Sequence, residues 1–267
     1  MIIGYLCAAI VGISLGILGS GGSILTVPIM VYLMHVSPPD AIANSLFVVG
    51  VTSAVGGIKY IRKQMVDLKT ALVFAIPSII SVFITRKFLV AAIPDTVMLM
   101  SSYSVSRNIF IMLLFSLVMI IAAYRMIRNT VIKEPAVSEV RKYNYPWLIL
   151  VGFVSGALTG FLGVGGGFII IPALVLFAKI PVKMSVGTSL LIIAFNSLSG
   201  YTEEILKNHT SVDYEFLLKF CLLSIAGIFI GFRISMNMQP SLLKKIFGWF
   251  ILVMGVCILV KEIYFRM

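Results

Sequence analysis

Two stretches of sequence decide the fold of this chain, GILGSGGSILTVP at residues 16–28 and GFLGVGGGFIIIP at residues 160–172. Each places a run of glycines inside an apolar segment and follows it with a proline, Pro28 or Pro172. Glycine adopts positive φ angles without steric cost, and proline lacks the N–H that a helix interior needs. Each stretch therefore predicts a break in the long apolar segment that contains it.

The apolar segments around these stretches are too long to cross a membrane once. Residues 2–39 and 143–178 contain no Asp, Glu, Lys or Arg. A straight helix of 36 residues would extend about 54 Å at about 1.5 Å per residue, against a hydrocarbon core of about 30 Å. Each block is therefore expected to break at its glycines into two segments that cross twice or enter the bilayer and return.

The composition places the chain among membrane proteins. Hydrophobic residues make up 60% of the 267, charged residues 12%, and the mean hydropathy is +1.10. Long, continuous apolar runs predict helices instead of barrel strands, because backbone polar groups in lipid must be paired within their own segment. We expect an all-α polytopic protein with three further spans in each half, at 41–58, 70–91 and 107–126, and at 184–202, 216–235 and 243–260.

Several other features have ordinary explanations. The net charge of +11 fits Lys and Arg collected in cytoplasmic loops and does not indicate nucleic acid. Cys7, Cys221 and Cys257 lack metal-type spacing and are interpreted as buried thiols. The two histidines, His35 and His209, fall beside predicted loops and are interpreted as surface residues. No cofactor or metal site is predicted, and the N-terminus is interpreted as a retained first span.

The two halves of the chain repeat each other. Gly12–Gly56 aligns without a gap onto Gly156–Gly200, a shift of 144 residues, with twelve of 45 positions identical. Further along, a shift of 146 aligns Phe83 with Phe229 and Pro94 with Pro240. Matching Gly and Pro residues carry the comparison, because they interrupt regular backbone. We interpret residues 1–127 and 146–267 as two repeats, joined by a cytoplasmic linker at 128–145.

Equivalent loops of the two repeats carry opposite charge. The loop at 59–69 holds four Lys or Arg residues, and its counterpart at 203–215 holds one Lys and four acidic residues. Cytoplasmic loops are enriched in Lys and Arg. The halves are therefore expected to have opposite orientations in the membrane, an inverted repeat of the kind found in many secondary transporters.

The glycine clusters are candidates for a central anion site. A helix that starts after unwound chain points its first N–H groups and its partial positive charge into the cavity before it. The alternative is close helix packing by small residues. A nucleotide-binding loop does not fit, because neither cluster ends in Lys-Ser/Thr or matches GxGxxG. The candidate residues are Gly19, Ser20, Gly21, Gly22 and Ser23, with Gly163, Gly165, Gly166 and Gly167.

A second polar set lies on the span that follows each cluster. Its members are Asn44, Ser45, Thr52 and Ser53 in the first half, and Thr188, Ser189, Asn196 and Ser197 in the second. Spacings of seven to eight residues place each set on one helix face. Ser and Thr can instead bond to their own helix backbone. Asn44 and Asn196 are the stronger candidates for facing a cavity.

Lys87 and Arg233 occupy equivalent positions under the shift of 146. They lie near the ends of equivalent spans, where one cationic entrance on each side of the membrane would help to admit an anion. The alternative is that both side chains extend to the interface without a role in transport.

The repeated motifs resemble those of the sulfite exporter TauE/SafE family, also called the TSUP permeases. They are the two stretches quoted first, followed by NSLFVVGVTSAVG at 44–56 and TSLLIIAFNSLSG at 188–200. The first copy departs from the family pattern at Ser23, where the family has glycine. The resemblance covers nearly the whole chain. It implies transport of sulfur-containing anions such as sulfite, sulfonates or sulfoacetate across a bacterial inner membrane.

The leading hypothesis is a secondary transporter of a small sulfur-containing anion that works by alternating access. Its partners would be the anion, the bilayer and a coupling ion, either a proton or sodium. A carrier for another organic anion, a passive channel and an integral membrane enzyme remain alternatives. The enzyme is disfavoured because the spans show no converging His, Asp or Cys groups.

Overall fold

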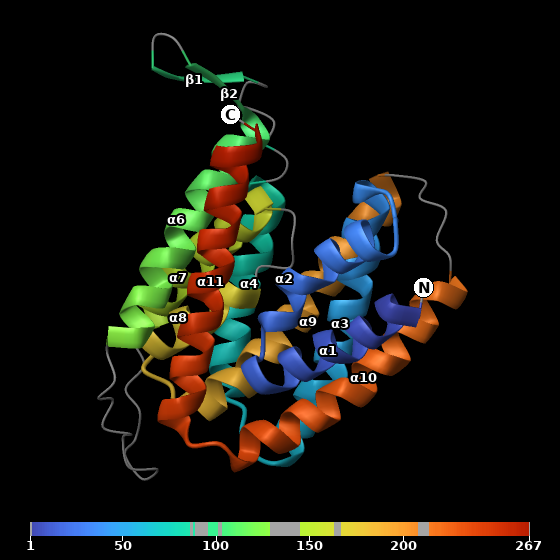
Figure 1. The fold of residues 1–267 in the computed structure, drawn as a ribbon. Coiled ribbons are helices and arrows are strands. Elements are labelled where there is room, and N and C mark those ends of the chain that lie inside the picture. The colour runs from blue at the N-terminus through green and yellow to red at the C-terminus, as the bar shows by residue number, and fades with distance from the viewer. Residues whose placement is uncertain are drawn as a thin grey trace.

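The computed structural model describes residues 2–85, 88, 96–100, 103–128, 145–162, 167–207 and 214–266. Nearly all of them are helical (Figure 1). One short antiparallel hairpin, which pairs Thr96 with Ser106, is added to the predicted helices. Its Thr, Val and Tyr residues favour extended backbone. In chain order the elements are α1 (Ile2–Leu18), α2 (Gly21–Pro28), the π-helix η1 (Ile29–Leu33), α3 (Pro38–Arg62), α4 (Leu68–Ile84), β1 (Thr96–Met100), β2 (Tyr103–Ser106), α6 (Arg107–Arg128), α7 (Tyr145–Leu162), α8 (Gly167–Leu176), α9 (Val182–Lys207), α10 (Tyr214–Asn237) and α11 (Pro240–Arg266).

The first apolar block is broken where its glycines predict. Helix α1 ends at Leu18 and α2 begins at Gly21. The chain then runs back along α1, because a β-carbon at Gly22 would lie 2.5 Å from Leu15 Cγ and one at Gly4 would lie 2.6 Å from Met34 Cγ. The first block is thus a helical hairpin. In the second block α7 ends at Leu162 and α8 begins at Gly167, and residues 163–166 between them fall outside the described part of the chain.

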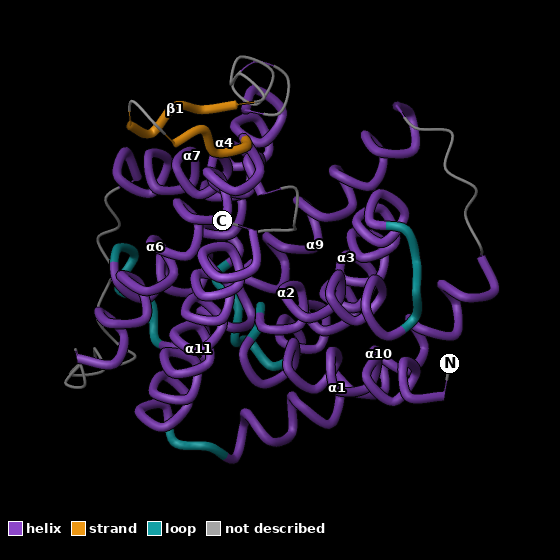
Figure 2. Tube along the Cα trace, turned by 45° about the horizontal axis from the view of Figure 1, so that its top comes forward, coloured by secondary structure: helices purple, strands orange, loops and turns teal. Residues whose placement is uncertain are grey.

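The most extensive helix contacts each join one half of the sequence to the other. Helix α1 packs on α10, α4 on α7, α3 on α9, and α6 on α11. Figures 1 and 2 both place the α1–α10 pair on one side of the molecule and the α6–α11 pair on the other. The two sequence halves are therefore interleaved, and most of the packing between helices joins one half to the other.

Glycines allow two of these pairs to approach closely. A β-carbon at Gly12 of α1 would overlap the backbone of Ser224 in α10, and one at Gly156 of α7 would overlap the backbone of Ser78 in α4. Gly12 and Gly156 are equivalent under the shift of 144 residues, and Ser78 and Ser224 under the shift of 146. Small residues at such crossings are the usual means of close helix packing in membranes. The same crossing is therefore built twice from equivalent residues.

The turn after each short helix also occurs twice. His35 and Lys179, which are 144 residues apart, both have positive φ angles, of 56° and 53°. The N–H of Val36 donates to Met30 O at 3.0 Å, and the N–H of Ile180 donates to Leu174 O at 3.2 Å. Both turns are helix ends closed by a residue in the left-handed region. The sequence repeat is thus accompanied by a repeat of local backbone geometry.

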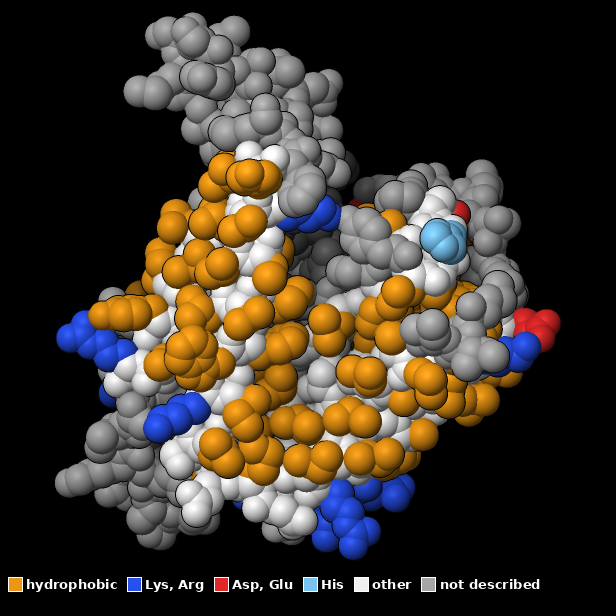
Figure 3. Space-filling model, in the orientation of Figure 1, with side chains coloured by type: hydrophobic (Ala, Val, Ile, Leu, Met, Phe, Trp, Pro, Cys, Tyr) orange, Lys and Arg blue, Asp and Glu red, His pale blue; other side chains and the backbone are white. Residues whose placement is uncertain are grey.

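The outer surface of the described helices is strongly apolar. Large hydrophobic side chains such as Leu6, Ile76 and Trp249 are more than half exposed. Figure 3 shows hydrophobic side chains over most of the visible face, with charged side chains mainly toward its margins. Four segments within the described residues are long and apolar enough to cross a membrane, and shorter apolar helices accompany them. The four are Asp40–Arg62, Val182–Leu206, Glu215–Asn237 and Pro240–Lys261.

Candidate functional site

Helices α3 and α9 form a buried antiparallel pair that carries the predicted polar set. A β-carbon at Gly50 would lie 2.9 Å from Leu198 Cγ, and one at Gly57 would lie 3.2 Å from Leu191 Cγ. This register brings Thr52 of α3 level with Asn196 of α9. The two residues are equivalent under the shift of 144, so the pair crosses about a point that relates the two halves.

All eight members of the polar set are buried, but they differ in their hydrogen bonds. Ser45 and Ser189 donate to the carbonyls of Ile42 and Val186 in their own helices, each at 2.8 Å. Thr188 Oγ1 accepts a hydrogen bond from the N–H of Asp67 at 3.1 Å. These bonds match the alternative of local backbone bonding for Ser45 and Ser189.

A second group of polar atoms is buried without a hydrogen-bond partner among the described residues. It includes the hydroxyl oxygens of Ser20, Thr52, Ser53 and Ser197 and the side-chain carbonyl of Asn196, and the hydroxyls of Thr70 and Ser81 on α4 share this property. The amide nitrogen of Asn196 donates to Ser78 Oγ at 3.0 Å. Leaving a buried polar group unpaired costs about 1–3 kcal/mol, so each such group calls for an explanation. A polar solute within reach of these groups would supply the missing hydrogen-bond partners.

The helix break of the first half meets the polar helix of the second. Gly19 has a φ angle of +67° and its N–H closes the last turn of α1 on Leu15 O at 2.7 Å. Ser189 Oγ donates to Gly19 O at 3.4 Å. A β-carbon at Gly19 would lie 2.7 Å from Ser189 Oγ. The left-handed backbone and the close approach both require glycine here. The structure thus brings two of the predicted site elements together.

Helix α2 begins at this break. Its N-cap residue, Ser20, makes no side-chain capping bond. The first N–H groups of a helix lack intrahelical acceptors, and the helix dipole adds partial positive charge at the same place. Ser23 Oγ donates to Ser20 O at 2.8 Å, so Ser23 stabilises the backbone between α1 and α2. The start of α2 therefore has the build of an anion-binding helix end.

Gly21 and Gly22 have different surroundings. A β-carbon at Gly22 would lie 2.5 Å from Val11 O, so this glycine is needed for packing on α1. At Gly21 the nearest atoms belong to side chains, Leu18 Cδ1 at 3.0 Å and Phe250 Cε1 at 3.4 Å. Gly167 begins α8, whereas Gly163, Gly165 and Gly166 lie outside the described residues. The packing interpretation accounts for Gly22 and leaves Gly21 as the better candidate for contact with a solute.

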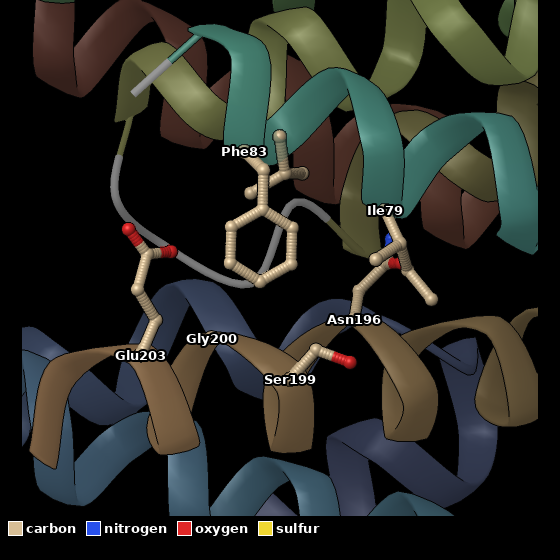
Figure 4. A pocket seen from close by; sticks show the side chains of 7 residues that line it. Ile79, Phe83, Asn196, Ser199, Gly200 and Glu203 are labelled. Carbon is tan, nitrogen blue, oxygen red and sulfur yellow. The ribbon is translucent and has the colours of Figure 1, made fainter. Parts of the chain in front are cut away.

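A narrow pocket opens beside Asn196, between α4 and α9 (Figure 4). Its empty space of about 180 Å³ includes open solvent, and no part of it is wide enough to hold a water molecule. Ile79, Val82 and Phe83 line it from α4, and Asn196, Ser199, Gly200 and Glu203 line it from α9. Of the predicted polar set, Asn196 is the member that lies in the wall of this pocket. Asn44 is buried on α3, with 8% of its surface exposed.

The sequence did not single out three residues that help to form this region. Ser78 Oγ accepts the hydrogen bond from the Asn196 side-chain amide. Ser78 could have been identified from the sequence, because it is equivalent to Ser224 under the shift of 146. Tyr60 Oη donates to Gly16 O at 3.2 Å, near the end of α1. Glu203 lies in the pocket wall. Of the two predicted entrance residues, Arg233 is exposed on α10 and Lys87 falls outside the described residues.

The chemistry of this region is that of neutral hydrogen bonding. Most buried polar side chains among the described residues are Ser, Thr or Asn, and the buried Tyr60 adds a phenol hydroxyl. No group of three His, Cys, Asp or Glu residues is close enough to hold a metal ion in that part of the chain. Hydroxyl groups and helix N–H groups donate hydrogen bonds to an anion without adding a compensating charge.

Comparison with known proteins gives one consistent result. The chain is 28% identical over 280 residues to the probable membrane transporter protein YunE of Bacillus subtilis, with 97% of this chain and 98% of the relative covered. It is 27% identical over 259 residues to a probable membrane transporter protein of Xylella fastidiosa, covering 94% and 91%. No solved structure matches. The model of the sulfite exporter TauE/SafE family matches residues 4–258. The chain is a multi-pass membrane protein and belongs to the sulfite exporter TauE/SafE family.

Proposed function

We propose that this protein is a secondary transporter that carries a small sulfur-containing anion, such as sulfite or an organosulfonate, across the membrane by alternating access. The relatives are described as membrane transporters and the family as sulfite exporters. The observation that carries the proposal is the group of buried polar atoms at Ser20, Thr52, Ser53, Asn196 and Ser197 that lack partners among the described residues.

The chemistry of these groups suits a sulfur oxyanion. Sulfite and sulfonates present three oxygen acceptors in a compact pyramid, and hydroxyl groups can donate to each of them. The start of α2 adds N–H donors and partial positive charge. A site with no formal charge binds such an anion loosely enough to release it. Binding and release are both required in each transport cycle.

The pairing of the two halves supports an inverted repeat and alternating access. The α1–α10 and α4–α7 crossings are built from equivalent residues, and α3 and α9 pack antiparallel about Thr52 and Asn196. In an inverted repeat, exchanging the conformations of the two halves converts access from one side into access from the other. A site close to the relating axis is then reached from both sides in turn.

Transport of labelled sulfite into proteoliposomes tests this function. We expect saturable uptake and accelerated exchange when unlabelled sulfite is placed on the opposite side, because a carrier returns faster when it is loaded. Uptake that rises linearly with concentration and shows no exchange would indicate a channel. Conversion of sulfite to another product would indicate an enzyme. Preferential competition by small carboxylates over sulfonates would assign the carrier to another class of organic anion.

The glycines at the start of α2 give a sharper test of the site. Gly21→Ala adds a methyl group that meets only side-chain atoms, so the protein should still fold. If the Gly21 N–H contacts the anion, sulfite should no longer raise the melting temperature of this variant. In the wild type, a ligand at one hundred times its dissociation constant stabilises by about 2.7 kcal/mol. Wild-type stabilisation of the variant by sulfite would place the site elsewhere.

A further inference from the structure

The side chain of Tyr60 lies where helices α1, α3, α9 and α10 meet. Tyr60 is near the end of α3, and none of its surface is exposed. Its ring packs edge-on against Phe232 of α10, with the ring centroids 4.7 Å apart. A β-carbon at Gly187 of α9 would lie 2.8 Å from Tyr60 Cδ1, so this glycine makes room for the ring. Figures 1 and 2 place these helices on the same side of the molecule. The ring is thus held by α9 and α10, and its hydroxyl reaches α1.

The hydroxyl of Tyr60 holds the end of α1. Tyr60 Oη donates to Gly16 O at 3.2 Å, and Ser235 Oγ of α10 lies 3.5 Å from the same hydroxyl. The last carbonyls of a helix lack intrahelical partners. The N–H of Gly19 closes the last turn on Leu15 O, so Gly16 O is the next carbonyl of α1 and lies beyond that bond. Tyr60 therefore supplies a hydrogen bond that the broken helix cannot supply itself.

A hydroxyl of α9 holds the same break three residues further along the chain. Ser189 Oγ lies 3.4 Å from Gly19 O. Hydroxyls from α3 and α9 thus hold the backbone at Gly16 and at Gly19, directly before α2 begins. Carbonyl oxygens repel an anion and N–H groups attract it, so a site at this break depends on which of the two its backbone presents.

The sequence repeat does not supply a second copy of the Tyr60 contact. The shift of 144 relates Gly16 to Gly160 and Tyr60 to Glu204. A carboxylate accepts hydrogen bonds and cannot donate one to a carbonyl. Removal of the Tyr60 hydroxyl is therefore not compensated by the equivalent residue of the other half.

We propose that Tyr60 is a positioning residue of the transport site, whose hydroxyl orients the break between α1 and α2 so that the first N–H groups of α2 face the anion. This inference rests on the proposed function. Tyr60 acts on the anion through the backbone, because its hydroxyl bonds to Gly16 O in a fully buried position. The ring serves the packing of the helices, and the hydroxyl has the positioning role.

Tyr60→Phe isolates that role, because it removes the hydroxyl and keeps the ring that packs on Phe232. In proteoliposomes we expect the half-saturating concentration of labelled sulfite to rise about 3- to 10-fold, the effect of one lost hydrogen bond. The maximal rate per folded protein should stay close to that of the wild type. A contact that only stabilises the fold would lower the amount of folded protein and leave the half-saturating concentration unchanged. Placing p-aminophenylalanine at position 60 returns an N–H donor to the ring and should restore the wild-type value.

Tyr124→Phe is the matched control. The Tyr124 hydroxyl accepts a hydrogen bond from Arg128 Nη1 on the exposed surface of α6, so the same atom is removed away from the break. The half-saturating concentration should be unchanged. A wild-type value for Tyr60→Phe, or an equal rise in both variants, would overturn the inference while leaving the transport function standing. Absence of saturable sulfite uptake in the wild type would refute the proposed function and this inference with it.

Hydrogen exchange tests the break itself and begins with the wild type, so it does not depend on how well a variant folds. Sulfite should slow amide exchange at residues 20–23, where α2 begins, and leave α6 and α11 unchanged. In Tyr60→Phe the same amides should exchange faster without sulfite and be protected less by it. Sulfite transport by the wild type without protection of residues 20–23 would place the anion elsewhere and overturn the inference.

Discussion

Individual hydroxyl groups in this protein fall into two classes. Ser45, Ser116 and Ser189 donate to their own helices, whereas Ser53 and Ser197 are buried with no partner among the described residues. The residue type is the same in each case. The difference lies in what surrounds each side chain, and it separates hydroxyls that bond to their own helix from buried hydroxyls that we propose as contacts for a solute.

Removing an unpaired hydroxyl should therefore stabilise the protein and impair its function. Ser197→Ala relieves the burial of an unsatisfied group, which is worth about 1–3 kcal/mol, and should raise the melting temperature in the absence of substrate. Sulfite transport should fall at the same time. Ser116→Ala is the matched control, since this hydroxyl bonds to Leu113 O on the remote helix α6, and transport should be unchanged. A Ser197→Ala variant with normal transport would show that the hydroxyl has no role in the site.

At position 19 the backbone conformation requires a glycine. Its φ angle of +67° and its contact with Ser189 leave no room for a side chain. Gly19→Ala combines left-handed backbone strain with overlap, at a cost of about 1–3 kcal/mol. We expect a clear fall in melting temperature, measured in detergent. Gly200→Ala is the comparison, because a β-carbon there would meet ordinary contact distances, and its melting temperature should change little.

Whole helices are held together across the sequence repeat. Gly12 on α1 and Gly156 on α7 allow their helices to touch the backbones of α10 and α4, respectively. Close contact replaces the hydrophobic driving force that helices lack in lipid. The α1–α10 crossing also anchors the hairpin of α1 and α2 that contains the first glycine cluster, so the packing of these elements positions the candidate site.

Large side chains at these crossings should separate the helix pairs. Gly156→Leu would force α7 away from α4, and overpacking of this kind costs about 1–3 kcal/mol or more. We expect loss of thermal stability and a broadened size-exclusion profile. Phe153→Leu, on the exposed face of the same helix, should behave like the wild type. Equal stability of the two variants would show that the crossing is not tightly packed.

The whole molecule is an interleaved assembly of two repeats with an apolar outer surface. Its loop charges predict that equivalent loops face opposite sides of the membrane. The loop that follows α3 is rich in Lys and Arg, and the one that follows α9 is rich in acidic residues. We propose that this inverted arrangement is the large-scale property on which the proposed alternating access depends.

Cysteine labelling can establish that arrangement. In a background without Cys7, Cys221 and Cys257, Leu206→Cys should react with a membrane-impermeant reagent added to intact cells, because Leu206 is 84% exposed near the acidic loop. Lys63→Cys should react only after the membrane is opened. Labelling of both positions from the same side would contradict the inverted repeat.

Most of the architecture could be predicted from the sequence, because it depends on local properties of the chain. Apolar runs of sufficient length require helices in lipid, and Gly19 and Ser20 break the first block between α1 and α2. The six further spans fall on α3, α4, α6, α9, α10 and α11. The same local reasoning found the repeat and the polar residues on α3 and α9. Family motifs then identified the transporter family.

The candidate site could be predicted only in part. Composition named the polar residues, but it could not tell that Ser189 bonds to Val186 while Ser197 is unpaired, or that Gly22 packs on α1 while Gly21 meets only side chains. Such distinctions depend on which helix lies opposite each residue, and that is decided by contacts between segments far apart in the chain. The sequence by itself determined the membrane class, the helices, their breaks and the repeat, because these follow from hydrophobicity and backbone chemistry within single segments. Only the tertiary structure decided that α1 packs on α10 and that Asn196 reaches Ser78, because each of these depends on the packing of side chains from different helices.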